Sequence, residues 1–334
     1  MAVILAFFCF IGAVLLAGFI YQTLGKLTDR RRFPAPGRLL TIGRQTFHVV
    51  EKGAGPTVVL ESGIASTSIA WLKVQAELAK EARVIAYDRA GLGWSSPPHT
   101  PRTLENVVDE LHAVLHRIEA PQPFILVGHS YGGLVVRLFS KLHPDEVAGI
   151  VLVDPVDTRD WYPIAEPQRR RLARGVMLSR RGALLARIGL VRFALALLIS
   201  GSRRLPRLIS RWSAGKGASV TQNIAGEVRK LPPYVWPMIC MNWSNAKCFT
   251  TMAEYLERLP RSAQTVHEAG WPTGIPIIAL IASTTAPDFP EDVVHRLATR
   301  SGHWIQLDEP ELVVETIREL LSRPQCAKGA GSTV

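Results

Sequence analysis

The 334-residue sequence lacks the features that mark several large classes of protein. Its four cysteines are too few and too dispersed for a disulfide-stapled scaffold, and no histidine near Cys240 or Cys248 suggests a zinc site. It contains no GxGxxG after a strand-like run, no GxxxxGK[ST] loop, and no internal repeat of about 20 to 50 residues. These absences exclude the common nucleotide-binding enzymes, solenoids and small secreted scaffolds.

Acidic residues are missing from one stretch, and this explains the net charge of +11. Thirteen of the 39 Lys and Arg residues lie between Arg169 and Lys216, with no Asp or Glu among them, while the other 26 face 28 acidic residues. A nucleic-acid partner is therefore not expected. Because Leu, Ile and Phe alternate with these cations, we expect contact with membrane lipid, the alternative being a solvated outer face of Arg residues.

Charged side chains are also absent from residues 2–25, and residues 2–20 are almost wholly apolar. A helix of about 20 such residues can cross a bilayer. A cleaved signal peptide usually has basic residues before a shorter apolar run, whereas here Lys26 and Arg30 follow it. We expect a single-pass membrane anchor, with a signal peptide or a buried core helix as alternatives. The positive-inside rule then predicts a cytoplasmic location for the rest of the chain.

From residue 38 onward, strand-like and helix-like segments alternate. Apolar runs such as Thr57–Glu61 and Gly149–Val153 have the composition of buried strands, and amphipathic stretches such as Thr103–Ile118 separate them. The alternation predicts the α/β class, with a doubly wound, mostly parallel sheet and helices on both faces. It stops between about 157 and 265, where helices with Pro and Gly breaks predict an insertion that covers an active site.

These patterns divide the chain into six parts. They are a transmembrane anchor (1–25), a basic, Pro-rich linker (26–37), the first part of an α/β core (38–156), a helical, basic cap (157–265), the second part of the core (266–323) and a flexible tail (324–334). Because the cap interrupts the core, residues from both core parts can meet at the carboxyl edge of one sheet.

A Gly-His-Ser-Tyr-Gly run, from Gly128 to Gly132, stands between the apolar strand Phe124–Val127 and a predicted helix. In this strand–turn–helix context, GxSxG forms a sharp turn that lifts the serine hydroxyl above the sheet. The flanking positions are glycine because the turn leaves no room for side chains. Ser130 is therefore the candidate nucleophile.

A serine nucleophile needs a base, and His303 is the candidate among the nine histidines. It lies between the last predicted strand and the last helix, in a loop that opens onto the same sheet edge as Ser130. His129 is expected to pack beneath the turn. The remaining histidines are assigned surface or capping roles: His48, His99, His112, His116, His143, His267 and His295.

The carboxylate that orients the base has two candidate positions. Asp154 stands directly at the end of the strand Gly149–Val153, where Pro155 follows it. Asp288 lies in the loop where such an acid is more common, but it comes several residues after its strand. We prefer Asp154 and keep Asp288 as the alternative acid. The remaining candidates are Asp157 and Asp160.

Two backbone N–H groups are expected to form an oxyanion hole. One belongs to Tyr131, the residue after the nucleophile, and the other to Ile64, in a loop where Gly63 permits the turn. The donor is a backbone amide, so the side chain at each position matters little. This chemistry requires no cofactor and no metal, and none is expected.

With these segments the sequence resembles the capped branch of the α/β-hydrolase superfamily, which includes esterases, monoacylglycerol lipases and prolyl aminopeptidases. Within about residues 38–323, the matching stretches are Val58–Gly63, Tyr87–Ser95, Phe124–Gly133, Val147–Asp154 and Ser301–Pro310. The resemblance implies a structural role for Asp88 and Arg89, and some dehalogenases of the branch place the acid where Asp154 stands. Dehalogenases and epoxide hydrolases use an aspartate nucleophile, so Ser130 argues against both activities.

The expected function is hydrolysis of a small-molecule carboxylic ester, expected to be lipophilic, by a Ser-His-Asp triad through an acyl-enzyme. An aminopeptidase or amidase with the same triad is one alternative, although an aminopeptidase would need acidic residues in the cap, which is basic. A catalytically silent, membrane-bound binding protein is the alternative from another class. The sequence identifies no protein partner.

Overall fold

The computed structural model describes residues 1–199, 229–282 and 289–323. The chain divides into two compact units, each considered by itself. The core unit comprises Ala35–Val176 and Glu254–Val334, and the helical unit comprises Met1–Pro34 and Met177–Ala253.

The core unit is built on an eight-stranded sheet. Its strands are β1 (Arg38–Ile42), β2 (Gln45–Lys52), β3 (Thr57–Glu61), β4 (Arg83–Asp88), β5 (Phe124–His129), β6 (Val147–Val153), β7 (Ile277–Ile281) and β8 (Val294–Leu297). They are ordered β1-β2-β4-β3-β5-β6-β7-β8, β2 is antiparallel to both of its neighbours, and the other neighbouring pairs are parallel. The predicted α/β class with a mostly parallel sheet is confirmed.

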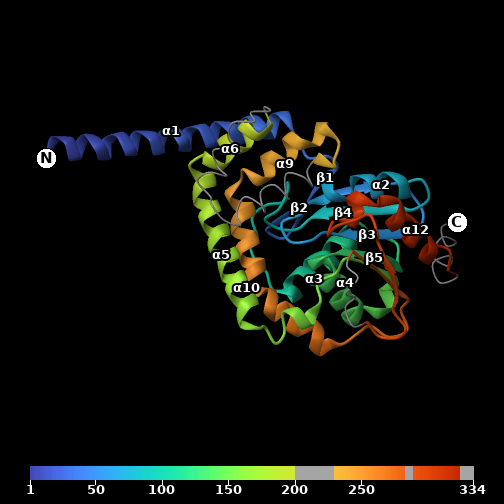
Figure 1. Ribbon diagram of the computed structural model, residues 1–334. Coiled ribbons are helices and arrows are strands. Elements are labelled where there is room, and N and C mark those ends of the chain that lie inside the picture. The colour runs from blue at the N-terminus through green and yellow to red at the C-terminus, as the bar shows by residue number, and fades with distance from the viewer. Residues whose placement is uncertain (200–228, 283–288, 324–334) are drawn as a thin grey trace. The chain divides into compact units, whose positions relative to one another are not determined.

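Helices cover both faces of this sheet. They are η1 (Ser68–Trp71), α2 (Leu72–Leu78), α3 (Leu104–Arg117), α4 (Tyr131–Leu142), η2 (Pro144–Glu146), η3 (Thr158–Asp160), α11 (Ile305–Asp308) and α12 (Pro310–Leu321). Helices α2 and α12 pack together on one face, and α3 and α4 pack together on the other (Figure 1). Every residue of β3, β5, β6 and β7 is buried, as the apolar runs in the sequence predict for strands covered on both sides.

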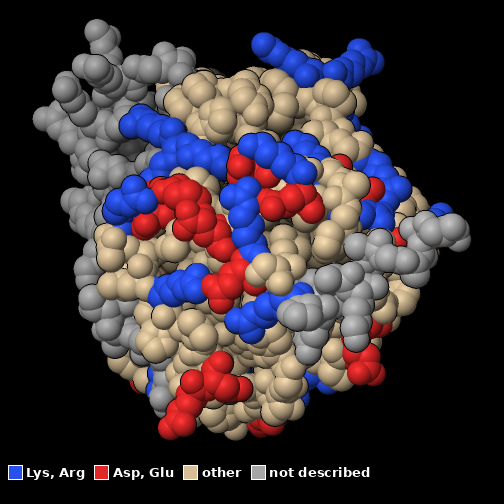
Figure 2. Space-filling view, turned by 90° about the vertical axis from the view of Figure 1, so that its right-hand side faces the viewer, with Lys and Arg blue, Asp and Glu red and all other residues tan. Residues whose placement is uncertain are grey.

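Charges of both signs are interspersed on the face of the molecule shown in Figure 2. Ion pairs join α12 to the region of α2, where Arg318 lies 2.6 Å from Glu81 and 3.3 Å from Glu77. Exposed pairs of this kind contribute little stability. They do show that charges are locally balanced here, which agrees with a net positive charge concentrated in residues 169–216.

The described part of the helical unit consists of helices. They are α1 (Ala2–Arg32), the second part of α5 (Glu166–Arg187), α6 (Leu190–Ile199), η4 (Pro233–Val235), α9 (Trp236–Trp243) and the first part of α10 (Ala246–Ala269). Helix α1 is strongly apolar, its most apolar stretch is not buried, and it is long enough to cross a membrane. It continues to Arg32, so the first seven residues of the expected linker, 26–32, are helical.

The two halves of α1 differ in their contacts. Residues 1–17 are exposed throughout. Beyond them, the Gln22 side chain is buried, donates to the Ser244 carbonyl at 2.8 Å and accepts from Arg192 Nε at 2.9 Å. Arg192 also forms an ion pair of 2.7 Å with Asp29. The second half of α1 is therefore part of the helical unit, and the first half presents an exposed apolar surface.

Candidate active site

Ser130 occupies the sharp turn between β5 and α4. Its φ of 54° and ψ of −116° are strained for a residue with a side chain. The turn has no room for side chains on either side: a Cβ on Gly128 would lie 2.5 Å from the Gly132 carbonyl oxygen, and one on Gly132 would lie 2.5 Å from that of Glu61. The local geometry is thus the one predicted from the glycines.

The strand register brings four strand ends together at this turn. Glu61 pairs with Gly128, His129 with Val153, and Val153 with Leu280. The Ser130 N–H donates to the Val153 carbonyl at 3.0 Å. Ser130 is consequently tied by its main chain to the end of β6, directly before Asp154.

Asp154 and His303 are in direct contact, with 2.6 Å between Asp154 Oδ2 and His303 Nδ1. The other carboxylate oxygen, Oδ1, accepts from the Ala282 N–H at 3.0 Å. Burial acts to raise the pKa of Asp154, but the hydrogen bonds from His303 and Ala282 hold that pKa below its usual value. An ionised Asp154 accepts the Nδ1 proton, which leaves the lone pair of His303 on Nε2.

The imidazole of His129 links the turn to the His303 loop. It is buried, its Nε2 donates to the His303 carbonyl at 2.9 Å, and the two rings lie 4.8 Å apart. Burial and the nearby His303 lower the pKa of His129 to about 3, so it is neutral at physiological pH. The side chain expected to pack beneath the turn therefore also positions the His303 main chain.

The loop after β3 approaches the nucleophile closely. A Cβ on Gly63 would lie 3.3 Å from Ser130 Cβ and 3.0 Å from His129 Nδ1, so glycine is the residue that fits there. The next residue, Ile64, is half-buried, and Tyr131 begins α4. The loop of Ile64 and the helix start at Tyr131 are thus brought to Ser130.

Arg89 supports this loop; the resemblance implied a structural role for it, but the sequence did not show which groups it contacts. Its buried guanidinium donates to the Gly63 carbonyl and, at 3.0 Å, to Glu61 Oε1, and its Cζ lies 5.2 Å from the centre of the Tyr131 ring. In a trans peptide the C=O and N–H bonds point in opposite directions, so this contact turns the Ile64 N–H away from Arg89. The signal for the role was Glu61, because a carboxylate ending a buried strand requires a cationic partner.

The other candidates have different surroundings. Asp288 lies outside the described residues. Asp157 is paired with its neighbour Arg159 at 2.8 Å. Asp88 accepts from His48 Nδ1 and from the Ser68 and Trp94 N–H groups, which is the structural role that the resemblance implies.

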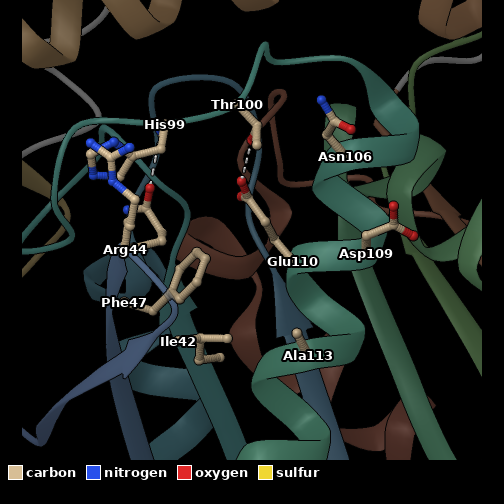
Figure 3. Close-up of a pocket in the computed structure, with 10 residues that line it drawn as sticks. Ile42, Arg44, Phe47, His99, Thr100, Asn106, Asp109, Glu110 and Ala113 are labelled. Atoms are coloured by element: carbon tan, nitrogen blue, oxygen red, sulfur yellow. Dashed lines mark hydrogen bonds between the residues drawn. The ribbon is translucent and has the colours of Figure 1, made fainter.

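A pocket of about 400 Å³ lies between the β1–β2 hairpin and α3 (Figure 3). Its lining includes none of the triad candidates. Glu110 reaches across it to accept from the Thr100 hydroxyl at 2.9 Å, and it also pairs with the buried Arg102. Since this carboxylate already has its partners, we assign the pocket to packing rather than to chemistry.

Comparison with known proteins gives matches to part of the chain. Residues 56–195 match a protein family described as "alpha/beta hydrolase fold". The uncharacterized protein YqjL of Bacillus subtilis (strain 168) is 31% identical over 143 residues, which are 42% of this chain and 56% of that protein. The 2-(acetamidomethylene)succinate hydrolase of Mesorhizobium japonicum is 35% identical over 117 residues, or 35% and 42% of the two chains. The chain thus spans about half the length of the curated relatives it matches.

Solved structures match over more of the chain. The Cif epoxide hydrolase from Acinetobacter nosocomialis superposes with a TM-score of 0.65 at 16% identity, and the superposition covers 91% of this chain and 96% of that one. At this level of identity the likeness concerns the fold, and the chemistry has to be argued from the side chains.

Proposed function

We propose that this chain, which belongs to the α/β-hydrolase superfamily, is a serine hydrolase that cleaves carboxylic esters with Ser130, His303 and Asp154 as its triad. The observation that carries the proposal is the 2.6 Å contact between His303 Nδ1 and Asp154 Oδ2. It is made next to the main-chain bond that ties Ser130 to Val153. The fold accounts for the hydrolase class, and these side chains favour a serine nucleophile.

In the first half of the reaction, His303 Nε2 takes the proton of the Ser130 hydroxyl as Oγ bonds to the ester carbonyl carbon. The carbonyl oxygen becomes an oxyanion, which accepts from the Ile64 and Tyr131 N–H groups. Because Tyr131 is at the start of α4, the helix dipole adds to this stabilisation. The C–O bond to the alcohol then breaks, and His303 gives its proton to the leaving alkoxide.

In the second half, His303 takes a proton from water as the water oxygen bonds to the acyl carbon. The bond to Ser130 Oγ breaks, the proton returns to Ser130, and the carboxylic acid leaves. Asp154 remains ionised throughout and holds the imidazole with its lone pair directed away from the carboxylate. Its lowered pKa supports this role, because hydrogen bonds to the ionised form are what lower it.

An amidase with the same triad is the second candidate. It is favoured by one observation, the name of the Mesorhizobium japonicum relative, whose substrate carries an acetamido group. Amides are harder to cleave than esters, and the leaving nitrogen needs the same proton from His303. Paired ester and amide substrates with one acyl group therefore separate the two candidates.

We also propose that α1 anchors the enzyme in a membrane, with the rest of the chain on the cytoplasmic side. The exposed apolar surface of residues 1–17 supports an anchor. The contacts of Gln22 and Asp29 with Ser244 and Arg192 argue against removal as a signal peptide, because cleavage after them would break buried hydrogen bonds. An anchored enzyme of this kind suits lipophilic esters dissolved in the bilayer.

The test uses detergent-solubilised full-length protein and p-nitrophenyl esters from acetate to palmitate, with the matching p-nitroanilides. We expect ester hydrolysis that is lost in Ser130→Ala, with faster turnover of the longer acyl chains. Anilide turnover equal to that of the esters would favour the amidase. Full activity in Ser130→Ala, or no turnover of any ester by folded protein, would contradict the proposal.

A further inference from the structure

Three histidines and one glutamate meet in the core unit at a place that ester hydrolysis does not use. His112 and His116 are one turn apart on α3, so their side chains share a face of that helix. His143 ends α4, and Glu146 ends η2 directly after it. Four groups that can ligate a metal thus come from two packed segments.

One donor atom from each of His112, His143 and Glu146 lies within 4.8 Å of the other two, and His116 adjoins this group. Glu146 Oε1 lies 3.0 Å from His112 Nε2, 3.6 Å from His116 Nε2 and 4.0 Å from His143 Nδ1. The Nε2 atoms of His112 and His116 are 2.9 Å apart. In a tetrahedral zinc site with bonds of about 2.0–2.1 Å, neighbouring ligand atoms are about 3.3 Å apart. Side-chain adjustments would bring the donor atoms of His112, His143 and Glu146 to that spacing, and a rotation of the His116 side chain would add its Nε2 as the fourth.

Hydrogen bonds alone satisfy this cluster poorly. If His112 Nε2 carries a proton, that one proton must serve both Glu146 Oε1 and His116 Nε2. If it carries none, a nitrogen lone pair and a carboxylate oxygen face each other at 3.0 Å. The second oxygen, Glu146 Oε2, is buried and has no hydrogen-bond partner among the described residues. A cation at the centre would instead accept lone pairs from the imidazole nitrogens and from Glu146 Oε1, and so would relieve the contact between two acceptors.

The imidazoles are held in place by aromatic packing. The rings of His112 and His143 are stacked, with centres 3.9 Å apart and planes 6° apart. Phe139 lies behind them, 4.9 Å from the His143 ring and 5.8 Å from the His112 ring. His116 is about half exposed, with 53% of its side chain accessible, so an ion can enter from solvent. Because a metal ion lies in the plane of each imidazole that binds it, metal binding would tilt His112 and His143 out of this stack, while His116 provides the accessible ligand.

We propose that His112, His116, His143 and Glu146 bind one divalent transition-metal ion of the zinc class. Three imidazole nitrogens and one carboxylate suit Zn²⁺, Co²⁺ or Ni²⁺, whereas Mg²⁺ and Ca²⁺ prefer oxygen ligands throughout. Four protein ligands fill a tetrahedron and leave no open position for water. The site is accordingly a structural or regulatory one that links α3 to η2, and it is separate from the triad.

The test is a titration of EDTA-treated, dialysed full-length protein with ZnCl₂, in which calorimetry measures the heat of binding. We expect one Zn²⁺ per chain with micromolar or tighter affinity, and a melting temperature raised by ~3 °C or more at saturation. Co²⁺ in place of Zn²⁺ should give the intense visible absorption of a four-coordinate ion. MgCl₂ should give neither heat nor a shift.

Two variants and a matched control assign the site. His116→Ala removes the most exposed ligand, so the fold should persist while affinity falls at least about tenfold. His112→Ala combined with His143→Ala should abolish the one-to-one binding. His99→Ala combined with His267→Ala removes two exposed histidines elsewhere and should leave it unchanged.

Three results would overturn the proposal. They are binding that needs millimolar Zn²⁺, tight binding that survives in His116→Ala, and a loss of binding in the His99 and His267 control equal to that in the cluster variants. Because the readouts are heat, absorbance and melting temperature, they do not depend on the proposed esterase activity.

Discussion

The core unit and the helical unit differ in which side chains they bury and which they expose. Around the proposed triad in the core unit, charged groups such as Arg89, Glu61 and Asp88 are almost fully buried and have several partners each. In the helical unit, large apolar side chains such as Leu184 and Phe193 are more than half exposed. The first unit fixes the groups of the proposed triad in position, and the second offers an apolar and basic surface.

This contrast separates two kinds of mutational effect. Changes to the buried polar groups that hold the proposed triad or the Ile64 loop should reduce turnover of every ester, because these groups position reacting groups. Changes on the surface of the helical unit and the adjoining basic segment should matter only when the ester is in a membrane. The predictions below test this separation, from the largest expected effect to the smallest.

The largest effect should follow from Ser130→Ala or His303→Ala, each of which should lower kcat by about 10⁶-fold for short and long esters alike. Since the two residues act together, the double variant should be hardly worse than either single one. Circular dichroism checks that the variants are folded. Losses that multiply in the double variant would show that the two residues act separately.

Asp154→Asn should lower kcat by about 10⁴-fold. The asparagine can hold the other tautomer of His303, which places the proton on Nε2 and removes the base. Asp157→Asn is the matched control, because Asp157 pairs with Arg159 and should affect activity little. Similar losses of kcat in both variants would show that Asp154 is not the acid of the triad.

Arg89→Met should lower kcat roughly 10²-fold with little change in KM. A misoriented Ile64 N–H would stabilise the oxyanion of the transition state less, whereas binding of the uncharged ester in the ground state depends little on it. Arg102→Met is the control, since Arg102 is equally buried and also pairs with a carboxylate, that of Glu110. Both variants should lose stability. A kcat loss of equal size in both would mean that Arg89 has only a structural role.

A several-fold effect on the hydrolysis of membrane-borne esters is expected from the basic surface of α5. Full-length enzyme in anionic vesicles should hydrolyse a membrane-borne ester several times faster than in neutral vesicles, and the ratio should fall as salt rises. Replacing the exposed Arg171, Arg174 and Arg181 of α5 by Gln should bring the ratio towards one, without changing turnover of p-nitrophenyl acetate.

The same charge change at Arg44, Lys52 and Arg117, which are exposed in the core unit, serves as the control and should leave the ratio unchanged. If the α5 variant kept the wild-type ratio, the basic segment would have no part in lipid contact.

The smallest effect concerns acid stability. Because the pKa of Asp154 is lowered by folding, its contribution to stability is complete above the unfolded-state pKa of about 3.9 and is lost as the pH falls through the folded-state value. Urea unfolding should therefore show a difference between wild type and Asp154→Asn at pH 7 that narrows below about pH 4. A difference that stays constant with pH would contradict the hydrogen-bonded, ionised Asp154.

The sequence was sufficient to predict those features of the fold and of the candidate site that depend on residues close together in the chain. The glycines around Ser130 predicted the strained turn, and the apolar runs predicted the buried parallel strands. Asp154 could be preferred because it directly ends its strand, and the register places that strand end beside the turn. The proximity of His303 followed from topology, because loops after parallel strands share one edge.

The sequence was insufficient to predict features that depend on contacts between segments far apart in the chain. Arg89 acquires its role from the Gly63 carbonyl, which lies 26 residues away and is brought near only when β3 and β4 pair. Similarly, His112 and His116 show a helical spacing in the sequence, but the approach of His143 and Glu146 depends on α3 packing against α4. At the N-terminus, the ion pair between Asp29 and Arg192 likewise joins segments that are far apart in the sequence.

The central claim is tested most directly by labelling the full-length protein with a fluorophosphonate and mapping the adduct by mass spectrometry. An activated serine reacts with this reagent, whereas an unactivated one does not. The account predicts one adduct per chain, on Ser130, with labelling abolished in Ser130→Ala and strongly slowed in Asp154→Asn. An adduct on another residue, or ester hydrolysis by protein whose Ser130 stays unlabelled, would contradict it.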